Sequence, residues 1–187
     1  MSRYVTRRCQ LALVVAVVGL WVVPPSLAEP RSAGLAQGVV QQINSVRREH
    51  GVGPLVLSVK LSAAARQHTL EMGSAGYFEH ESADHSAFSK RLERFYPWKG
   101  CDWKVGENLL YQSPDVSPGE VVKLWLESPG HRSNMLSPAW REVGVAAVHF
   151  DAAPGTYAGQ SVTIVTADFG ARRCRPAPRG AAKPTAG

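Results

Sequence analysis

The strongest constraint on the fold of this 187-residue chain is the order in which two kinds of hydrophobic pattern occur along it. Apolar residues first repeat at helical spacing, in segments 39–46, 61–72 and 88–96. β-Branched and aromatic residues concentrate later, which is typical of strands. The strands are predicted at residues 105–112, 143–150 and 161–169.

A fourth helix is predicted to begin at residues 117–120, Ser-Pro-Gly-Glu. Ser117 can cap it, Pro118 suits its first turn, and Glu120 can complete a capping box. Residues 129–130, Pro-Gly, are expected to end it. The turn-rich residues 151–159 predict that the last two strands form an antiparallel hairpin. Helices before, between and against an antiparallel sheet indicate an α+β domain with one core.

The N-terminus has the layout of a secretory signal peptide. Three arginines in residues 1–10 precede the apolar run 11–23, and small residues follow up to Ala28. We expect residues 1–28 to be a signal peptide that directs the protein to the cell envelope, the periplasm or the medium. The alternative is an uncleaved anchor, although 13 apolar residues are short of the about 20 that span a bilayer. Residues 29–37 contain Pro, Ser and Gly and predict a short linker.

The positive charge of the chain lies at its ends. The whole chain carries 21 Lys and Arg against 15 Asp and Glu, but residues 29–170 carry 13 basic against 15 acidic residues. The charge distribution therefore disfavours a basic nucleic-acid-binding domain. The domain is expected to span residues 38–170, and residues 171–187 to form a basic, disordered tail rich in Pro, Gly and Ala.

Cysteine usage agrees with export. Cleavage after Ala28 would remove Cys9 and leave Cys101 and Cys174. An even pair in an exported protein predicts one disulfide between them, and two unpaired thiols are the alternative.

The common catalytic signatures are absent from the sequence. It has no Gly-x-Ser-x-Gly elbow, no His-Glu-x-x-His pair and no phosphate-binding glycine loop. A polar series remains instead, spread over the middle of the chain: residues 78–82 (Phe-Glu-His-Glu-Ser), 106–109 (Gly-Glu-Asn-Leu) and 125–132 (Trp-Leu-Glu-Ser-Pro-Gly-His-Arg).

This series resembles the CAP superfamily, also called the SCP domain, which includes cysteine-rich secretory proteins, venom allergens and plant pathogenesis-related proteins. The likeness is to its short bacterial branch. Residues 78–82 resemble the Phe-x-His-x-Ser segment, residues 106–108 match the Gly-Glu-Asn motif, and residues 128–136 match Ser-Pro-Gly-His-Arg-x-Asn-Ile-Leu. The likeness extends over residues 39–170. It implies a three-layer α–β–α sandwich with a central antiparallel sheet.

The resemblance also implies a cleft with two histidines and two carboxylates, reported to bind divalent cations in some members. His80, Glu107 and His131 match three of these four positions. Ser128 stands at the fourth, and Glu127 lies one residue early, which on a helix rotates its side chain by about 100°. Asn108 and Arg132 are further cleft candidates, Asn108 as an orienting residue and Arg132 as an anion ligand or a salt-bridge partner.

Two imidazoles and a carboxylate suit zinc, so His80, His131 and Glu107 are candidate metal ligands, with zinc as the candidate cofactor. The alternative is that the same groups form a buried hydrogen-bond network that links helices to the sheet.

Three functions remain open at this point. The favoured one is a secreted, monomeric, non-enzymatic module that binds a small molecule, lipid, glycan or partner protein. A metal-assisted hydrolase that uses His80, Glu107 and His131 is the second, and a structural envelope protein is the third. No candidate nucleophile lies beside a base in a recognisable context, which disfavours catalysis.

Overall fold

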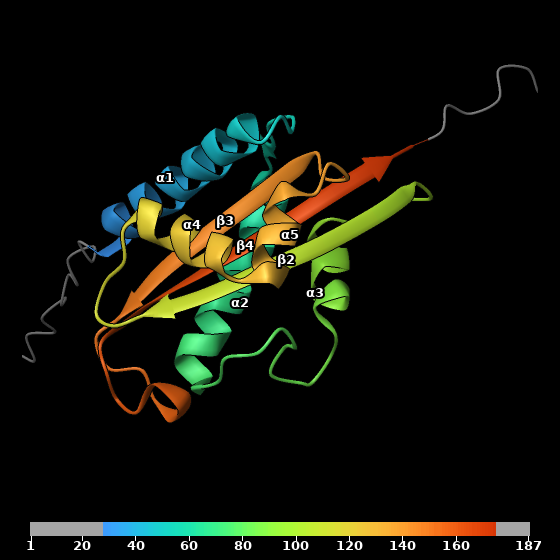
Figure 1. Cartoon of the computed structure of the whole chain (residues 1–187). Helices are drawn as coiled ribbons and strands as arrows, with labels where there is room; N and C mark the ends of the chain where they lie inside the picture. The colour runs from blue at the N-terminus through green and yellow to red at the C-terminus, as the bar shows by residue number, and fades with distance from the viewer. Residues whose placement is uncertain (1–27, 175–187) are drawn as a thin grey trace, which may run out of the picture.

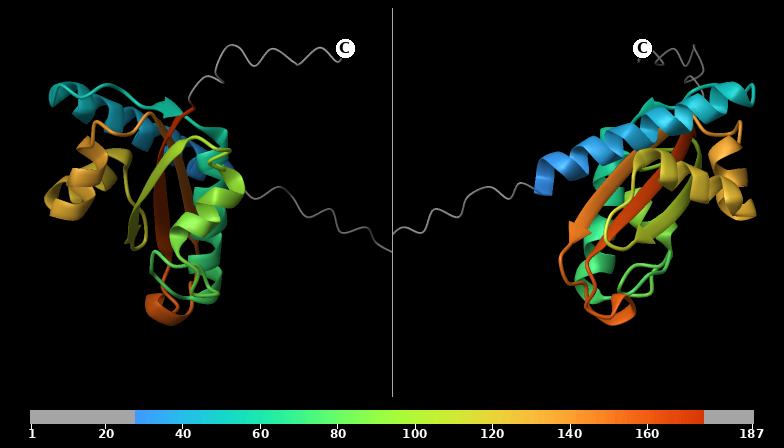
Figure 2. Two further views of the ribbon diagram at one scale, coloured as in Figure 1. Left: turned by 90° about the vertical axis from the view of Figure 1, so that its right-hand side faces the viewer. Right: turned by 60° about the vertical axis from the view of Figure 1, so that its left-hand side comes forward.

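The computed structural model describes residues 28–174, which form three layers. A four-stranded sheet lies in the middle, and Figure 2 shows helices on both of its faces. The elements in chain order are α1 (Ala28–Glu49), β1 (Val56–Leu57), α2 (Val59–Ala75), α3 (Phe88–Phe95), β2 (Asp102–Gln112), α4 (Pro118–Glu127), α5 (Pro129–Leu136), β3 (Glu142–Phe150), the 3₁₀ turn η1 (Gly155–Tyr157) and β4 (Val162–Arg173) (Figure 1). The predicted α+β class and layered architecture are confirmed.

The sheet has the strand order β1-β3-β4-β2, so β2 lies at one edge. Both β2 and β3 pair antiparallel with β4, which confirms the predicted hairpin of the last two strands. The sheet is mixed rather than purely antiparallel, because β1 pairs parallel with β3 over two residues. Two residues are too few to show a strand pattern in a sequence, and β1 was not predicted.

The helices divide between the two faces according to the alternation of strand residues. Val143, Val145 and Ala147 of β3 pack with α1 and α4 in one hydrophobic cluster. Gly144, on the opposite side of β3, faces α2, and its missing side chain lets the helix backbone approach the strand. Helix α3 packs beside α2 on that second face through Leu92 and Tyr96.

The N-terminal boundary differs from the prediction. Residues 29–37 were expected to be a linker, but they belong to α1, which begins at Ala28. Leu35 and Ala36 pack against the main hydrophobic cluster, so burial of these side chains extends the helix through a segment whose composition favours a turn. The predicted signal peptide, apart from Ala28, lies outside the described residues.

The C-terminal boundary also differs. The tail was expected from residue 171, but β4 continues to Arg173 because it pairs there with Asp102 at the start of β2. The predicted disulfide between Cys101 and Cys174 is confirmed and links the ends of these two strands. Residues 175–187 lie outside the described part of the chain.

Local signals place two of the helix ends. Gly76 ends α2 in a left-handed conformation, and Ser117 with Glu120 forms the predicted capping box of α4. Pro129 was expected to end the helical region, but it is the first residue of α5. This position suits proline, because a backbone N–H there would have no partner within the helix and proline has none. None of the helices in residues 28–174 is long and apolar enough to cross a membrane.

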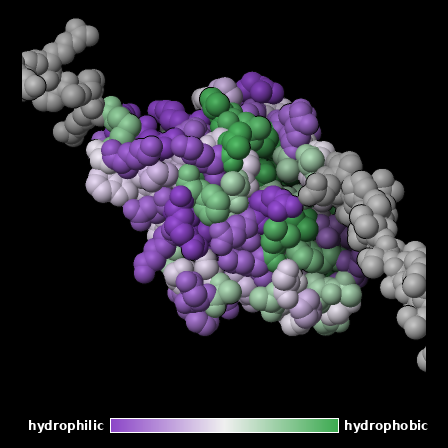
Figure 3. Space-filling model, turned by 180° about the vertical axis from the view of Figure 1, so that it is seen from behind, coloured by the Kyte–Doolittle hydropathy of each residue, from purple (hydrophilic) through white to green (hydrophobic). Residues whose placement is uncertain are grey.

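Hydrophobic residues also reach the surface in places. Figure 3 shows the face seen from behind, where they gather in two areas bordered by hydrophilic ones. The large exposed hydrophobic side chains of the described chain include Val56, Leu57 and Val59, which lie in β1 and at the start of α2.

The close approach of α2 to β3 gives a test of the fold. A Cβ at Gly144 would lie 2.0 Å from the backbone nitrogen of Ser62, so Gly144→Ala must push the helix away from the sheet. We expect it to lower the free energy of unfolding by about 3 kcal/mol, measured by urea denaturation. Gly119→Ala is the matched control: its Cβ meets nothing within 4 Å, so helix propensity should raise the stability by up to about 1 kcal/mol. Equal stability of the two variants would contradict the close α2–β3 contact.

Candidate functional site

A cleft of about 510 Å³ opens at the β2 edge of the sheet. The segment after α2 contributes to one side of it, and the start of α5 contributes to the other. Of the predicted site residues, the structure brings five into this cleft and leaves Glu127 and Arg132 out of its lining. The lining residues are His80, Glu107, Asn108, Ser128, Gly130, His131, Ser133, Asn134, Ser137 and Trp140.

Glu107 and Asn108 of the Gly-Glu-Asn motif both line the cleft. Side chains from both faces of β2 can do so because β2 is the edge strand of the sheet. Adjacent strand residues point to opposite faces, so Glu107 projects toward α3 and Asn108 toward α5. Asn108 donates a hydrogen bond to the backbone oxygen of His131 at 3.1 Å, and its own side-chain oxygen accepts one from Asn134 at 3.0 Å. Gly106 is required beside them, since a Cβ there would lie 2.7 Å from the side-chain oxygen of Asn134.

Glu107 is the anionic centre of the cleft. Its side chain is 1% exposed and accepts hydrogen bonds from two cationic or potentially cationic groups. His80 Nδ1 lies 2.8 Å from Oε1, and Nη2 of Arg91 pairs with Oε2. The buried carboxylate is thus compensated by a guanidinium, as a charge removed from water must be.

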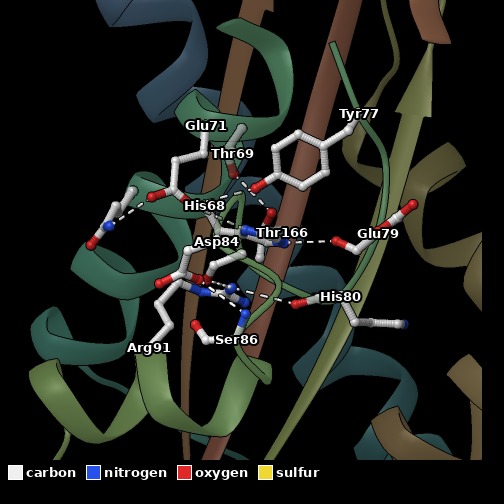
Figure 4. Close-up of polar contacts among 12 residues, drawn as sticks. His68, Thr69, Glu71, Tyr77, Glu79, His80, Asp84, Ser86, Arg91 and Thr166 are labelled. Atoms are coloured by element: carbon white, nitrogen blue, oxygen red, sulfur yellow. Dashed lines mark hydrogen bonds and ion pairs between the residues drawn. The ribbon is translucent and has the colours of Figure 1, made fainter. Parts of the chain in front are cut away.

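Arg91 is a site residue that the sequence analysis missed. It lies on α3 with a fully buried side chain, and it also donates to Ser82 Oγ at 2.9 Å and to the backbone oxygen of His80 at 3.4 Å. Figure 4 shows it beside the segment that carries His80. A signal was present: position 91 lies three residues after Phe88 and four before Phe95, which places a charged residue on the apolar face of the helix.

The two cleft histidines have opposite electrostatic environments. The hydrogen bond to Glu107 raises the pKa of His80 above its ordinary value, against an opposing effect of burial. Burial, with a smaller effect of His80, lowers the pKa of His131. The sequence placed His131 just beyond a helix, whereas it lies in the first turn of α5. One imidazole therefore tends to carry a proton and the other to be neutral at the same pH.

A second buried carboxyl group lies behind Glu107. Asp168 of β4 is the register partner of Glu107 in β2 and is fully buried. No N–H or O–H group of the described residues donates a hydrogen bond to its carboxyl oxygens, and its carboxyl group lies beside that of Glu107. Burial and the neighbouring Glu107 raise the pKa of Asp168 well above its ordinary value. The sequence motifs described above do not include Asp168.

Buried polar groups continue along α2. The Nε2 of His68 lies 2.9 Å from the backbone oxygen of Glu79, and Thr69 donates to Thr166 at 2.8 Å (Figure 4). His68 is fully buried in α2. These bonds connect α2 to the segment that carries His80 and to β4.

The candidate metal ligands do not fit a cation in this arrangement. Glu107 is already neutralised by Arg91, and a guanidinium against the only cleft carboxylate repels a divalent ion. Within residues 28–174 no three His, Cys, Asp or Glu side chains are placed to hold a metal. The Glu127 side chain, which could have replaced Ser128, is 59% exposed and pairs with Lys123 at 3.9 Å.

The comparisons with known proteins agree on one family. The sequence model of the cysteine-rich secretory protein family (CAP) matches residues 40–169. The uncharacterised protein YkwD of Bacillus subtilis is 34% identical over 111 residues, which cover 59% of this chain and 41% of YkwD. The chain therefore spans less than half the length of that curated relative.

Solved structures show the same fold. An extracellular protein of Bacillus anthracis that contains an SCP domain matches with a TM-score of 0.61 at 24% identity, over 79% of this chain and 44% of that one. An outer surface protein of Borrelia burgdorferi matches with a TM-score of 0.58 at 17% identity, over 73% of this chain and 92% of its own.

The contact between His80 and Glu107 gives a pH-dependent prediction. Glu107→Gln removes the negative charge, so we expect the pKa of His80 to fall to or below its ordinary value of about 6.5. Glu81→Gln removes a more weakly coupled charge and should lower it much less. Titration of the imidazole signals by NMR measures both, and equal shifts would show that Glu107 does not control His80.

The same contact determines how stability depends on pH. The folded-state pKa of His80 is raised, so its contribution to stability is complete below its unfolded-state pKa and is lost as the pH rises through the folded-state value. His80→Ala should therefore destabilise the protein more at pH 5.5 than at pH 8. The effect should stay below about 1 kcal/mol, because the side chain is 49% exposed.

Proposed function

The chain belongs to the cysteine-rich secretory protein family, and on that premise we propose that it is an exported module whose cleft binds a small polyhydroxylated ligand, a glycan, without transforming it. The predicted signal peptide supports export, as does the disulfide between Cys101 and Cys174, since disulfides persist in oxidising compartments. The structural neighbour from Bacillus anthracis is itself described as extracellular.

The class of ligand is inferred from the residues that line the cleft. Of its ten residues none is aliphatic, whereas serine, asparagine and histidine side chains supply both donors and acceptors. Hydroxyl groups of a sugar can satisfy such a surface, and an acyl chain cannot, because it would leave these polar groups without partners. The glycan is therefore favoured over the lipid.

Trp140 completes the polar lining with an aromatic ring. Its ring stacks on Phe169 of β4 at an interplanar angle of 24°, and its Nε1 donates to the backbone oxygen of Asn134 at 2.9 Å. The indole is thus held in place by the core before any ligand arrives. A fixed ring offers a sugar an apolar surface at little cost in side-chain entropy.

The absence of an activated nucleophile supports binding without turnover. The hydroxyl groups of the cleft belong to Ser128, Ser133 and Ser137. Among the described residues none of these hydroxyls forms a hydrogen bond with the imidazole of His80 or His131, so none is paired with a base.

Two neighbouring residues of α5 provide a matched test of the cleft. Ser133 lines it and is exposed, so Ser133→Trp should fill the space without disturbing the core. Arg132 is also exposed but does not line the cleft, so Arg132→Trp is the control. With oligomers of N-acetylglucosamine as the probe, we expect at least a tenfold loss of affinity in Ser133→Trp and little change in the control, measured by calorimetry.

Wild-type protein that binds none of these oligomers at millimolar concentration would contradict the glycan proposal and favour the structural envelope role. Affinity that is unchanged in both tryptophan variants would place the binding outside the cleft.

A second candidate function rests on the histidine pair. Two imidazoles in one cleft with pKa values moved in opposite directions are suited to act as general acid and general base. Under this candidate the protein is a hydrolase that needs no metal. Mass spectrometry of the same oligomers after incubation distinguishes the two functions. Cleavage by the wild type that disappears in both His80→Gln and His131→Asn would favour the hydrolase, and intact oligomers favour binding alone.

A further inference from the structure

The edge of the sheet opposite the cleft is partly uncovered. Strand β1 pairs only with the first two residues of β3, Glu142 and Val143, before the chain turns into α2. The rest of β3, up to Phe150, pairs with β4 on one side and with no strand of residues 28–174 on the other. This outer edge of β3 is distinct from the cleft, which lies at β2.

A groove of about 320 Å³ follows this edge. Five consecutive residues of β3 line it, so it meets the strand edge-on, because a cavity over one face would contact only alternate residues. Helices cover both faces of the sheet, and Val145, Ala146 and Ala147 are buried, each 6% exposed, so an occupant can reach the strand only through the groove. The lining residues are Val145, Ala146, Ala147, Val148 and His149 of β3, Ser32, Ala33 and Ala36 of α1, and Ser62 and Arg66 of α2.

The backbone groups that face the groove follow from the pairing of β1. The carbonyl oxygen of Val143 accepts a hydrogen bond from the N–H of Ser58, so Val143 points its backbone groups outward. Because strand residues alternate in this respect, the N–H and C=O groups of Val145, Ala147 and His149 also point outward. Those of Ala146 and Val148 point toward β4, their partner strand.

The shape of the groove selects its occupant. Its walls are built largely from alanine and serine of α1 and α2, which leave room for a polypeptide backbone close to the strand. The sheet edge of a second copy could not enter, since its own helices would collide with α1 and α2. A single extended segment can enter, and β1 is an example of such a segment on the same edge.

The end of the groove adds a charge preference. His149 lies between two carboxylates, with Nδ1 3.3 Å from Asp115 and Nε2 3.6 Å from Asp151. Arg66 on the α2 wall is the one permanent cation of the lining. Both aspartates are largely exposed, so the two carboxylates at the His149 end of the groove favour a basic residue there.

We propose that this groove binds an extended peptide segment of another protein, which adds to β3 as a further strand and places a Lys or Arg beside Asp115 and Asp151. This is recognition by β-strand addition, in which main-chain hydrogen bonds supply affinity and the flanking walls supply specificity. Small side chains on the segment match the alanine and serine walls.

Hydrogen exchange with defined peptides tests the proposal. The probes are acetylated seven-residue peptides of Val, Thr, Ala and Ser with a lysine at either end. Binding should slow exchange of the Val145, Ala147 and His149 amides at least tenfold and leave Ala146 and Val148 unchanged. Peptides that are N-methylated at alternate residues lack the needed donors and should not bind. Replacing the lysine by glutamate should weaken binding severalfold.

Two variants of α1 locate the peptide. Ala33 is exposed and lines the groove, so Ala33→Trp should block it, whereas Gln42 is exposed on the opposite side of the helix, so Gln42→Trp should leave binding unchanged. Any of three results would overturn the proposal: no binding by any peptide at millimolar concentration, equal binding of the N-methylated peptides, or protection without the alternating pattern. Ser133→Trp should leave this binding unaffected, so the groove and the cleft are tested separately.

Discussion

The buried ion pair between Arg91 and Glu107 is the interaction on which the arrangement of the cleft depends. Arg91 comes from α3, Glu107 from the edge strand β2, and the same guanidinium also holds Ser82 in the segment that carries His80. Three separated parts of the chain thus meet at one side chain. A buried charge that loses its partner costs about 3–5 kcal/mol, so loss of either member of the pair should strongly destabilise this packing. Apolar packing alone would not fix His80, which is half-exposed.

The same pair explains why the described side chains of the cleft do not fit a divalent cation. Where a second acidic residue would be needed to balance a cation, Ser128 lines the cleft instead, and Glu127 turns to the surface. The one negative charge that remains, on Glu107, is balanced by Arg91, and a protonated His80 adds a positive charge. A neutral or weakly anionic ligand suits this balance better than a divalent cation.

Sequence reasoning placed those features that depend on neighbours along the chain. The capping box at Ser117 is local, and the motifs identified His80, Glu107 and His131, which all line the cleft. Features that depend on distant contacts were missed. The segment 29–37 has a turn-like composition and is helical because Leu35 and Ala36 reach the core. Arg91 was missed because only its partner, 16 residues away on β2, explains a charge on an apolar face.

The sheet itself determines where function can lie. Helices cover both faces, so the backbone and the side chains near it are accessible only at the two edges. At the β2 edge, Asn108 and Asn134 tie the strand to α5, and side chains there form a polar cleft. At the β3 edge the short β1 leaves most of the strand without a neighbour. An unpaired edge is a hazard for aggregation unless flanking elements restrict access to it. Here α1 and α2 leave access to this edge for one extended chain only. The two helices that protect the edge from aggregation therefore also determine what can bind to it.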